Sequence, residues 1–90
     1  MDEAALIAVV GQALWGPTWK TPMADAVRHQ KSAIADWASG RQPVPVGVWS
    51  ELKEIVHRRR HELDALAPRI QKAHDAALQR MIEQTKLAKR

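Results

Sequence analysis

Three groups of helix-breaking residues place the strongest constraint on how this chain folds, because they divide it into short segments. The groups are Gly16-Pro17, Gly40, and the pair Pro43 and Pro45. Each proline removes a backbone donor and pushes the preceding residue toward extended geometry, while glycine readily ends a helix in the left-handed conformation. Between these breaks, apolar residues recur at intervals of three and four, and no stretch alternates as a strand would. The sequence therefore predicts an all-α protein.

We expect a small bundle of about five helices. They cover residues 2–14, 22–27, 31–39, 45–67 and 69–90. Thr21 is the expected N-cap of the second helix, because its hydroxyl can accept a hydrogen bond from an unpaired amide, and Pro22 then fills the first helical position. Pro68 either kinks or ends the fourth helix. Residues 1–67 thus form one domain, and residues 68–90 form a helical extension.

The core of this protein must consist of aliphatic side chains and tryptophan. The chain is 46% hydrophobic, as in globular proteins, and has four tryptophans but neither Phe nor Tyr. Trp37 and Trp49 fall on inward helix faces, and the core is also the expected place of Trp15 and Trp19. A chain of 90 residues buries a modest share of its surface, so formation of a dimer would add stability.

The positive charge lies in the second half of the chain. The formal net charge is +4, and residues 1–50 carry equal numbers of acidic and basic side chains. The densest basic stretch is His57-Arg58-Arg59-Arg60-His61. Arginine forks match phosphate oxygens, so this stretch suits a polyanion, although a solvated helix face has the same composition. A further basic group, expected to act as an electrostatic tail, is Lys86, Lys89 and Arg90.

Several functional classes lack the residues that they need. The chain has no cysteine, which excludes disulfides and thiolate metal sites and is typical of a reducing compartment. The longest apolar stretch, residues 4–10, is too short to span a bilayer, so we expect a cytoplasmic protein without a membrane segment. No carboxylates cluster around a histidine, and no glycine-rich phosphate loop is present. His57 and His61 are four residues apart, but only arginines separate them. We expect no catalytic residue, no cofactor and no metal site.

The stretch from Met23 to Gly40 meets the packing demands of a helix-turn-helix motif. Ala24 is small where the second helix crosses the first, and Val27 fills the corner between them. Ile34 and Trp37 lie one turn apart and anchor the second helix to the core. The opposite face of that helix is then free to enter the major groove of DNA. The expected base-reading residues are Gln30, Lys31, Ser32, Ala35 and Asp36.

Residues 15–66, about 52 of the 90, resemble the helix-turn-helix domain of the phage lambda repressor and Cro type. The family's recurring alanine, hydrophobic corner and branched aliphatic residue are Ala24, Val27 and Ile34 here. Its Trp-x-x-Gly ending is Trp37-Ala38-Ser39-Gly40, followed by Arg41-Gln42-Pro43. The glycine usual in the family's turn is Arg28 in this chain, and His29 replaces the apolar residue after it. The resemblance implies a regulator that binds a short palindromic operator as a dimer.

Contacts to the DNA backbone are expected from residues around the motif. By position, the family's phosphate-contacting residues at the start of the first motif helix correspond to Lys20 and Thr21. The full expected set is Lys20, Thr21, Arg28, Arg41, Arg58 and Arg59. Such contacts fix the position of a protein on the duplex and add affinity, but they carry no sequence information.

The sequence thus predicts a sequence-specific transcriptional regulator that binds double-stranded DNA as a homodimer and is associated with the nucleoid. The assignment as a repressor follows from the usual role of proteins in the family that it resembles. Two other interpretations stay open. A helical bundle with no DNA partner has the same apolar spacing. A protein-interaction module, such as an antitoxin or an adaptor, would hold a protein partner through residues 69–90.

Overall fold

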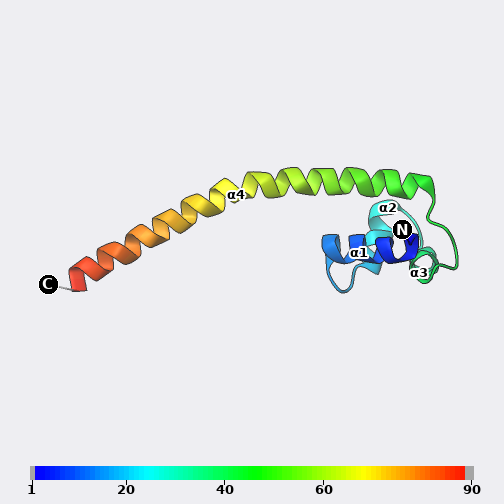
Figure 1. Cartoon of the computed structure of the whole chain (residues 1–90), viewed down its shortest axis with the longest axis horizontal. Helices are drawn as coiled ribbons and strands as arrows, with labels where there is room; N and C mark the ends of the chain where they lie inside the picture. The colour runs from blue at the N-terminus through cyan, green and yellow to red at the C-terminus, as the bar shows by residue number, and fades with distance from the viewer. Residues whose placement is uncertain (1, 89–90) are drawn as a thin grey trace. The chain divides into compact units, whose positions relative to one another are not determined.

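The computed structural model describes residues 2–88 of the chain, and over that range it is helical with no strand. The helices are α1 (Glu3–Trp15), α2 (Lys20–Val27), α3 (Lys31–Ser39) and α4 (Val46–Ala88), shown in Figure 1. The chain divides into a first unit, Met1–Val56, and a second unit, His57–Arg90. The prediction of an all-α protein is confirmed. Lys89 and Arg90 of the predicted basic tail lie outside the described residues.

The prediction of five helices is wrong, because α4 continues through Pro68. A proline inside a helix removes one hydrogen bond, here to the carbonyl of Asp64, and its ring crowds the preceding turn. In a helix of 43 residues the bonds on either side of that point persist. The exposed position of Asp64 leaves its carbonyl open to water. Proline therefore acts as a kink here, and α4 bends in its yellow stretch (Figure 1).

Helix α1 begins and ends with the caps that its sequence favours. The Asp2 side chain accepts a hydrogen bond from the Ala4 amide at 3.0 Å, and Glu3 adds a negative charge to the first turn. At the other end, Gly16 has φ +83° and donates its amide to the Gln12 carbonyl at 2.9 Å. The helix bounds match the predicted segment to within one residue.

Helix α2 begins two residues earlier than predicted, so the assignment of Thr21 as N-cap is wrong. The N-cap is Trp19, which makes no side-chain capping bond, and Lys20 is the first helical residue. Pro22 still lies in the first turn, where its missing amide would have had no partner within the helix. The buried Trp19 indole, 4% exposed, takes the place of a polar cap in fixing where the helix starts.

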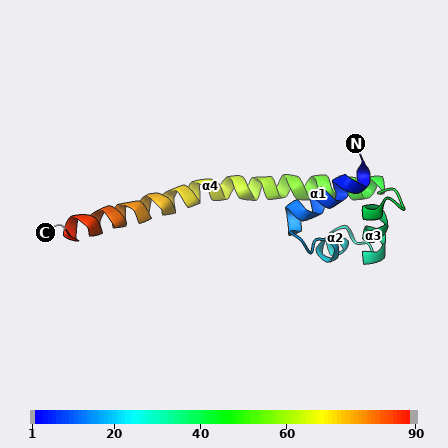
Figure 2. The ribbon, with the colours of Figure 1, turned by 60° about the horizontal axis from the view of Figure 1, so that its bottom comes forward.

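The core of the first unit lies where α1, α2, α3 and the start of α4 meet. Figure 2 shows α1, α2 and α3 gathered around it. Its centre is Ile7, Met23 and Ile34, all fully buried. Two tryptophans, Trp19 and Trp37, are also buried, as predicted, whereas Trp15 and Trp49 are only half-buried at its edge. The remaining buried members are Ala24, Val27, Val44, Val48 and Leu52.

The segment between α3 and α4 is tied back to the start of α1. Gly40 ends α3 in the left-handed conformation at φ +78°, as predicted, and its amide donates to carbonyls of the last turn. Four residues later the buried Val44 donates its amide to Glu3 Oε2 at 3.4 Å. This contact across 41 residues of sequence explains how a segment with two prolines follows a defined path.

The Trp19 ring packs directly against the backbone of Gly11 in α1. Gly11 is buried in the middle of α1, and the Trp19 ring lies against its backbone. A Cβ added at Gly11 would stand 2.8 Å from Trp19 Cγ and closer still to other ring atoms. Glycine normally weakens a helix interior, so its use here reflects the space that the indole needs.

We expect Gly11→Ala to destabilise the protein by about 1–3 kcal/mol, because the methyl group overlaps a buried ring rather than a mobile side chain. The matched control is Gly47→Ala in α4, where nothing lies within 4 Å of an added Cβ. That control should leave stability unchanged or raise it by about 0.5 kcal/mol. Urea unfolding followed by circular dichroism measures both. Equal stability of the two variants would show that Trp19 does not need the bare backbone at Gly11.

Candidate nucleic-acid interface

The turn between α2 and α3 consists of Arg28, His29 and Gln30. Arg28 adopts the left-handed conformation, with φ +60° and ψ +45°, and is the only described non-glycine residue with positive φ. The amides of Arg28 and His29 both donate to the Ala24 carbonyl. Arg28 is therefore the residue that turns the chain between α2 and α3. Because arginine has a Cβ, this left-handed conformation lowers the stability of the folded protein.

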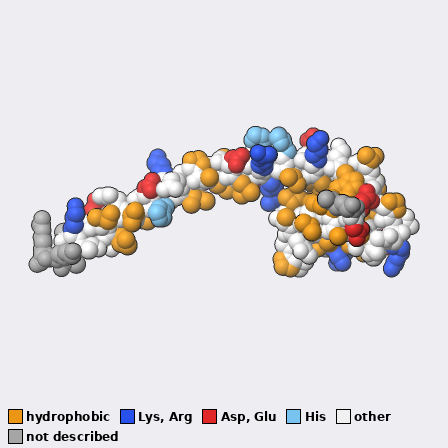
Figure 3. All heavy atoms as spheres, viewed as in Figure 1, with side chains coloured by type: hydrophobic (Ala, Val, Ile, Leu, Met, Phe, Trp, Pro, Cys, Tyr) orange, Lys and Arg blue, Asp and Glu red, His pale blue; other side chains and the backbone are white. Residues whose placement is uncertain are grey.

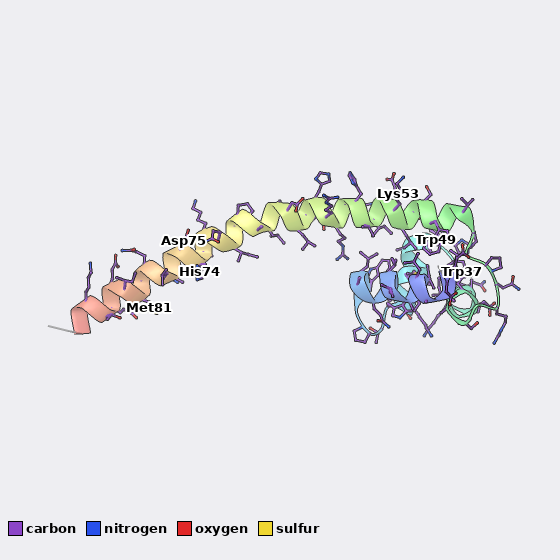
Figure 4. All side chains as sticks on the ribbon, in the orientation of Figure 1. Trp37, Trp49, Lys53, His74, Asp75 and Met81 are labelled. Atoms are coloured by element: carbon purple, nitrogen blue, oxygen red, sulfur yellow. The ribbon has the colours of Figure 1, made fainter. Side chains whose placement is uncertain are left out.

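The inward face of α3 is packed as the sequence predicts. Ala24 and Val27 of α2 are 6% and 4% exposed, and Ile34 and Trp37 of α3 are 0% and 4% exposed. Helix α3 packs against both α1 and α2, and Trp37 lies among the core side chains in Figure 4. His29 adds a contact that the sequence reasoning missed. Its ring meets Trp37 edge-on, with centroids 5.1 Å apart.

The outward face of α3 presents four of the five predicted base-reading residues to solvent. Gln30, Lys31, Ser32 and Ala35 are exposed, and all lie in the first half of the helix or just before it. The Gln30 carbonyl accepts hydrogen bonds from the amides of Ala33 and Ile34. Its side chain makes no capping bond, which leaves the amide group available for an external partner.

Asp36, the fifth residue of this set, is half-buried and closes the end of α3. Its carbonyl accepts the Ser39 hydroxyl at 3.1 Å and the Arg41 amide at 2.9 Å. Its carboxylate lies 3.5 Å from the Arg41 guanidinium, whose side chain is 75% exposed. An ion pair this exposed adds little stability. It does bring together a predicted base-reading residue and a predicted phosphate-contacting residue, which the sequence reasoning had not connected.

The backbone amides of the first two residues of α3 have no acceptor carbonyl within the helix. The Gln30 carbonyl pairs with the amides of Ala33 and Ile34, which leaves those of Lys31 and Ser32 directed outward. Unpaired amides at a helix N-terminus favour negative charge. Together with the Lys31 ammonium they make this end of α3 the part of the face best suited to an anion.

Four of the six predicted phosphate-contacting residues lie in the first unit with α3. Lys20 and Thr21 open α2, Arg28 forms the turn, and Arg41 follows α3, and all four are exposed. The Lys20 ammonium stands 5.9 Å from the Trp19 ring centroid, a distance at which a cation–π attraction orients the side chain.

Arg58 and Arg59 belong to the second unit, where both are exposed on α4. The histidines on either side of the arginine run contact each other, with ring centroids of His57 and His61 4.7 Å apart. Within residues 2–88 no group of three or more acidic or histidine side chains is arranged to hold a metal. The basic stretch is thus a solvated helix face with the charge to meet phosphates.

Two hollows on the surface of the first unit are lined by few side chains that could take part in catalysis. One, of about 360 Å³, is lined by Gln12, Gly16 and Pro17. The other, of about 270 Å³, is lined by apolar side chains of α1 and α4 with Lys53 as its one charged group. Neither lining combines a nucleophile, an acid and a base.

Comparison of the chain with protein-family models, with curated proteins and with solved structures finds no match. Among the described helices, none joins the length and the apolarity that crossing a bilayer requires. The residues around α2 and α3 themselves are therefore the basis for proposing a function.

The strained turn yields a stability prediction. Arg28→Gly should stabilise the protein by about 1 kcal/mol, because glycine adopts positive φ without the Cβ penalty. Arg28→Ala should give no such gain, since alanine keeps the Cβ. Thermal unfolding of the two variants beside the unmodified chain measures the difference. If alanine stabilises as much as glycine, the backbone at this residue is not left-handed.

Proposed function

We propose that this protein is a sequence-specific transcriptional regulator of double-stranded DNA, a repressor that occupies a short palindromic operator as a homodimer. The observation that supports this most is the α2–α3 pair. Its inner residues, Ala24, Val27, Ile34 and Trp37, are all buried, while the first half of α3 stays open to solvent. A short helix held in this way can place its N-terminal residues in the major groove. The proposal assigns no catalytic step to the protein.

The exposed residues of α3 have the chemistry for reading bases. The Gln30 amide can pair with adenine N6 and N7, and Lys31 can donate to guanine O6 and N7. Ser32 can pair with either kind of base, and the Ala35 methyl can contact the thymine methyl. Asp36 can accept from cytosine N4 on releasing Arg41, whose 3.5 Å ion pair is weak enough to exchange.

Affinity in this proposal comes largely from residues that touch the phosphates. Lys31 is the one basic residue of the reading face, and Asp36 offsets its charge. Lys20, Thr21, Arg28 and Arg41 are exposed in the first unit, which also contains this face, and Arg58 and Arg59 add charge from the second. Contacts of this kind release counterions, so binding weakens as salt rises.

A second function is favoured by one observation on the second unit. Ile70 and Met81 are 65% and 57% exposed, more than a helix in a monomeric protein usually leaves to water. Residues 69–90 could therefore hold a protein partner, as in an antitoxin or an adaptor. This function is compatible with DNA binding by the first unit.

Substitutions in the two groups of residues should separate base reading from phosphate contact. In Lys31→Ala combined with Ser32→Ala, we expect affinity for the best duplex to fall at least tenfold, while affinity for a random-sequence duplex changes much less. Arg59→Ala should weaken both duplexes about equally and reduce the slope of log affinity against log salt by about 1. Fluorescence anisotropy with the two labelled duplexes, at several salt concentrations, measures both effects.

Alanine is compatible with the helical conformation at all three positions, and circular dichroism controls for folding. Equal losses on both duplexes for the Lys31 and Ser32 variant would contradict the assignment of base reading to α3. A duplex affinity that does not change with salt would contradict DNA binding as such.

A further inference from the structure

A hollow of about 270 Å³ lies between α1 and the start of α4, within the first unit. It is lined by five apolar side chains and one lysine, namely Leu6, Val10, Trp49, Leu52, Lys53 and Val56. Apart from the buried Leu52, the apolar groups are partly open to solvent, and Val56 is 45% exposed. In Figure 3, apolar side chains gather over α1 and the adjoining start of α4. Apolar surface in contact with water costs free energy, so an apolar group that entered the hollow would be stabilised there.

The hollow lies beside the most loosely packed helix of the first unit. Helix α4 makes fewer close backbone approaches to α1, α2 and α3 than these helices make to one another, and it reaches the core through side chains such as Val48 and Leu52. Helix α1 is apolar nearly all round, since Gln12 is the one polar side chain between Ala4 and Leu14. A helix of that kind is normally covered on every side. The side of α1 that borders the hollow is the side that this chain covers only in part.

Lys53 gives the hollow its charge preference. It is the one charged residue in the lining, its side chain is exposed, and it forms no ion pair with any side chain that the structure describes. Trp49 and Lys53, both labelled in Figure 4, are one turn apart on α4, so an indole and an ammonium border the same space. An ammonium is a compact point charge with three donors. The lining is thus complementary to an anion that carries an apolar body.

We propose that this hollow binds a small carboxylate with an apolar body, the carboxylate at Lys53 and the apolar body against Leu6, Val10 and Trp49. Its volume of about 270 Å³ lies just below the range of about 300–1,000 Å³ typical of small-molecule sites. A peptide helix, about 10 Å across with its side chains, needs a longer groove. Size therefore favours a compact ligand such as a short fatty acid. For a ligand this small in an open site, we expect a dissociation constant of about 1 mM.

A ligand in the hollow would join α1 to α4 and add apolar contacts that the fold lacks. Because the site exists only in the folded first unit, binding raises the unfolding temperature. None of the six lining residues belongs to the set proposed to contact DNA. The site can therefore be tested without DNA, and the result is separate from the test of DNA binding.

Titration of the ¹⁵N-labelled full chain with hexanoate, followed by NMR, tests the proposal. We expect the largest shifts at the backbone amides of Leu6, Val10 and Lys53 and at the Trp49 indole N–H. Hexanamide has the same chain without the charge and should bind about fivefold more weakly. Shifts centred on the exposed leucines of the second unit, or no shift at about 20 mM hexanoate, would overturn the proposal. Equal affinities for hexanoate and hexanamide would overturn it as well.

Substitutions in the lining test which groups hold the ligand. Lys53→Gln should lower the affinity for hexanoate about fivefold, to that for hexanamide. The matched control, Lys72→Gln, removes the same charge from an exposed position of the second unit and should change neither affinity. Val56→Asp, which sets a carboxylate beside the hollow, should abolish hexanoate binding. The three side chains are exposed, and circular dichroism controls for folding. Equal losses for the two lysine variants, or unchanged binding to Val56→Asp, would contradict the site.

Discussion

The fit of the Trp19 indole against the bare backbone of Gly11 is the contact on which the first unit depends. It sets where α2 begins, in the absence of a polar cap, and so fixes the direction in which α2 leaves α1. Met23 and Ala24 then enter the core on the inner side of α2. Because the turn at Arg28 has a single left-handed residue, the placement of α2 also determines the placement of α3.

One face of α3 therefore packs in the core, and the opposite face exposes only a few side chains. A helix of nine residues anchored through Ile34 and Trp37 leaves the outer face of its first half open to a partner, and its end is closed by Asp36 and Gly40. The charge on that face is nearly balanced, so in the proposed DNA complex specificity and affinity would come from different residues. In the proposed homodimer, two such faces would contact one DNA molecule, which would add to both specificity and affinity.

The parts of the fold that sequence reasoning predicted are those governed by local chemistry. Gly40 ends α3 because only glycine adopts that backbone freely, and the spacing of Ile34 and Trp37 already defined the buried face. Thr21 failed as a cap because a distant contact, that of Trp19, decides the start of α2. Of the two outcomes expected at Pro68, a kink or a helix end, the helix end is wrong, because the length of α4 on both sides outweighs one lost hydrogen bond. The Glu3 contact to Val44 spans 41 residues, and no local pattern signals it.

The central claim is that the exposed half of α3 reads DNA sequence. Selection of bound molecules from a pool of random duplex DNA by the full-length chain, followed by sequencing, tests it most directly. We expect enrichment of one inverted repeat with half-sites about one helical turn apart, since a two-fold dimer would present two reading faces at that spacing. A bound pool with the same sequence composition as the starting pool would contradict it.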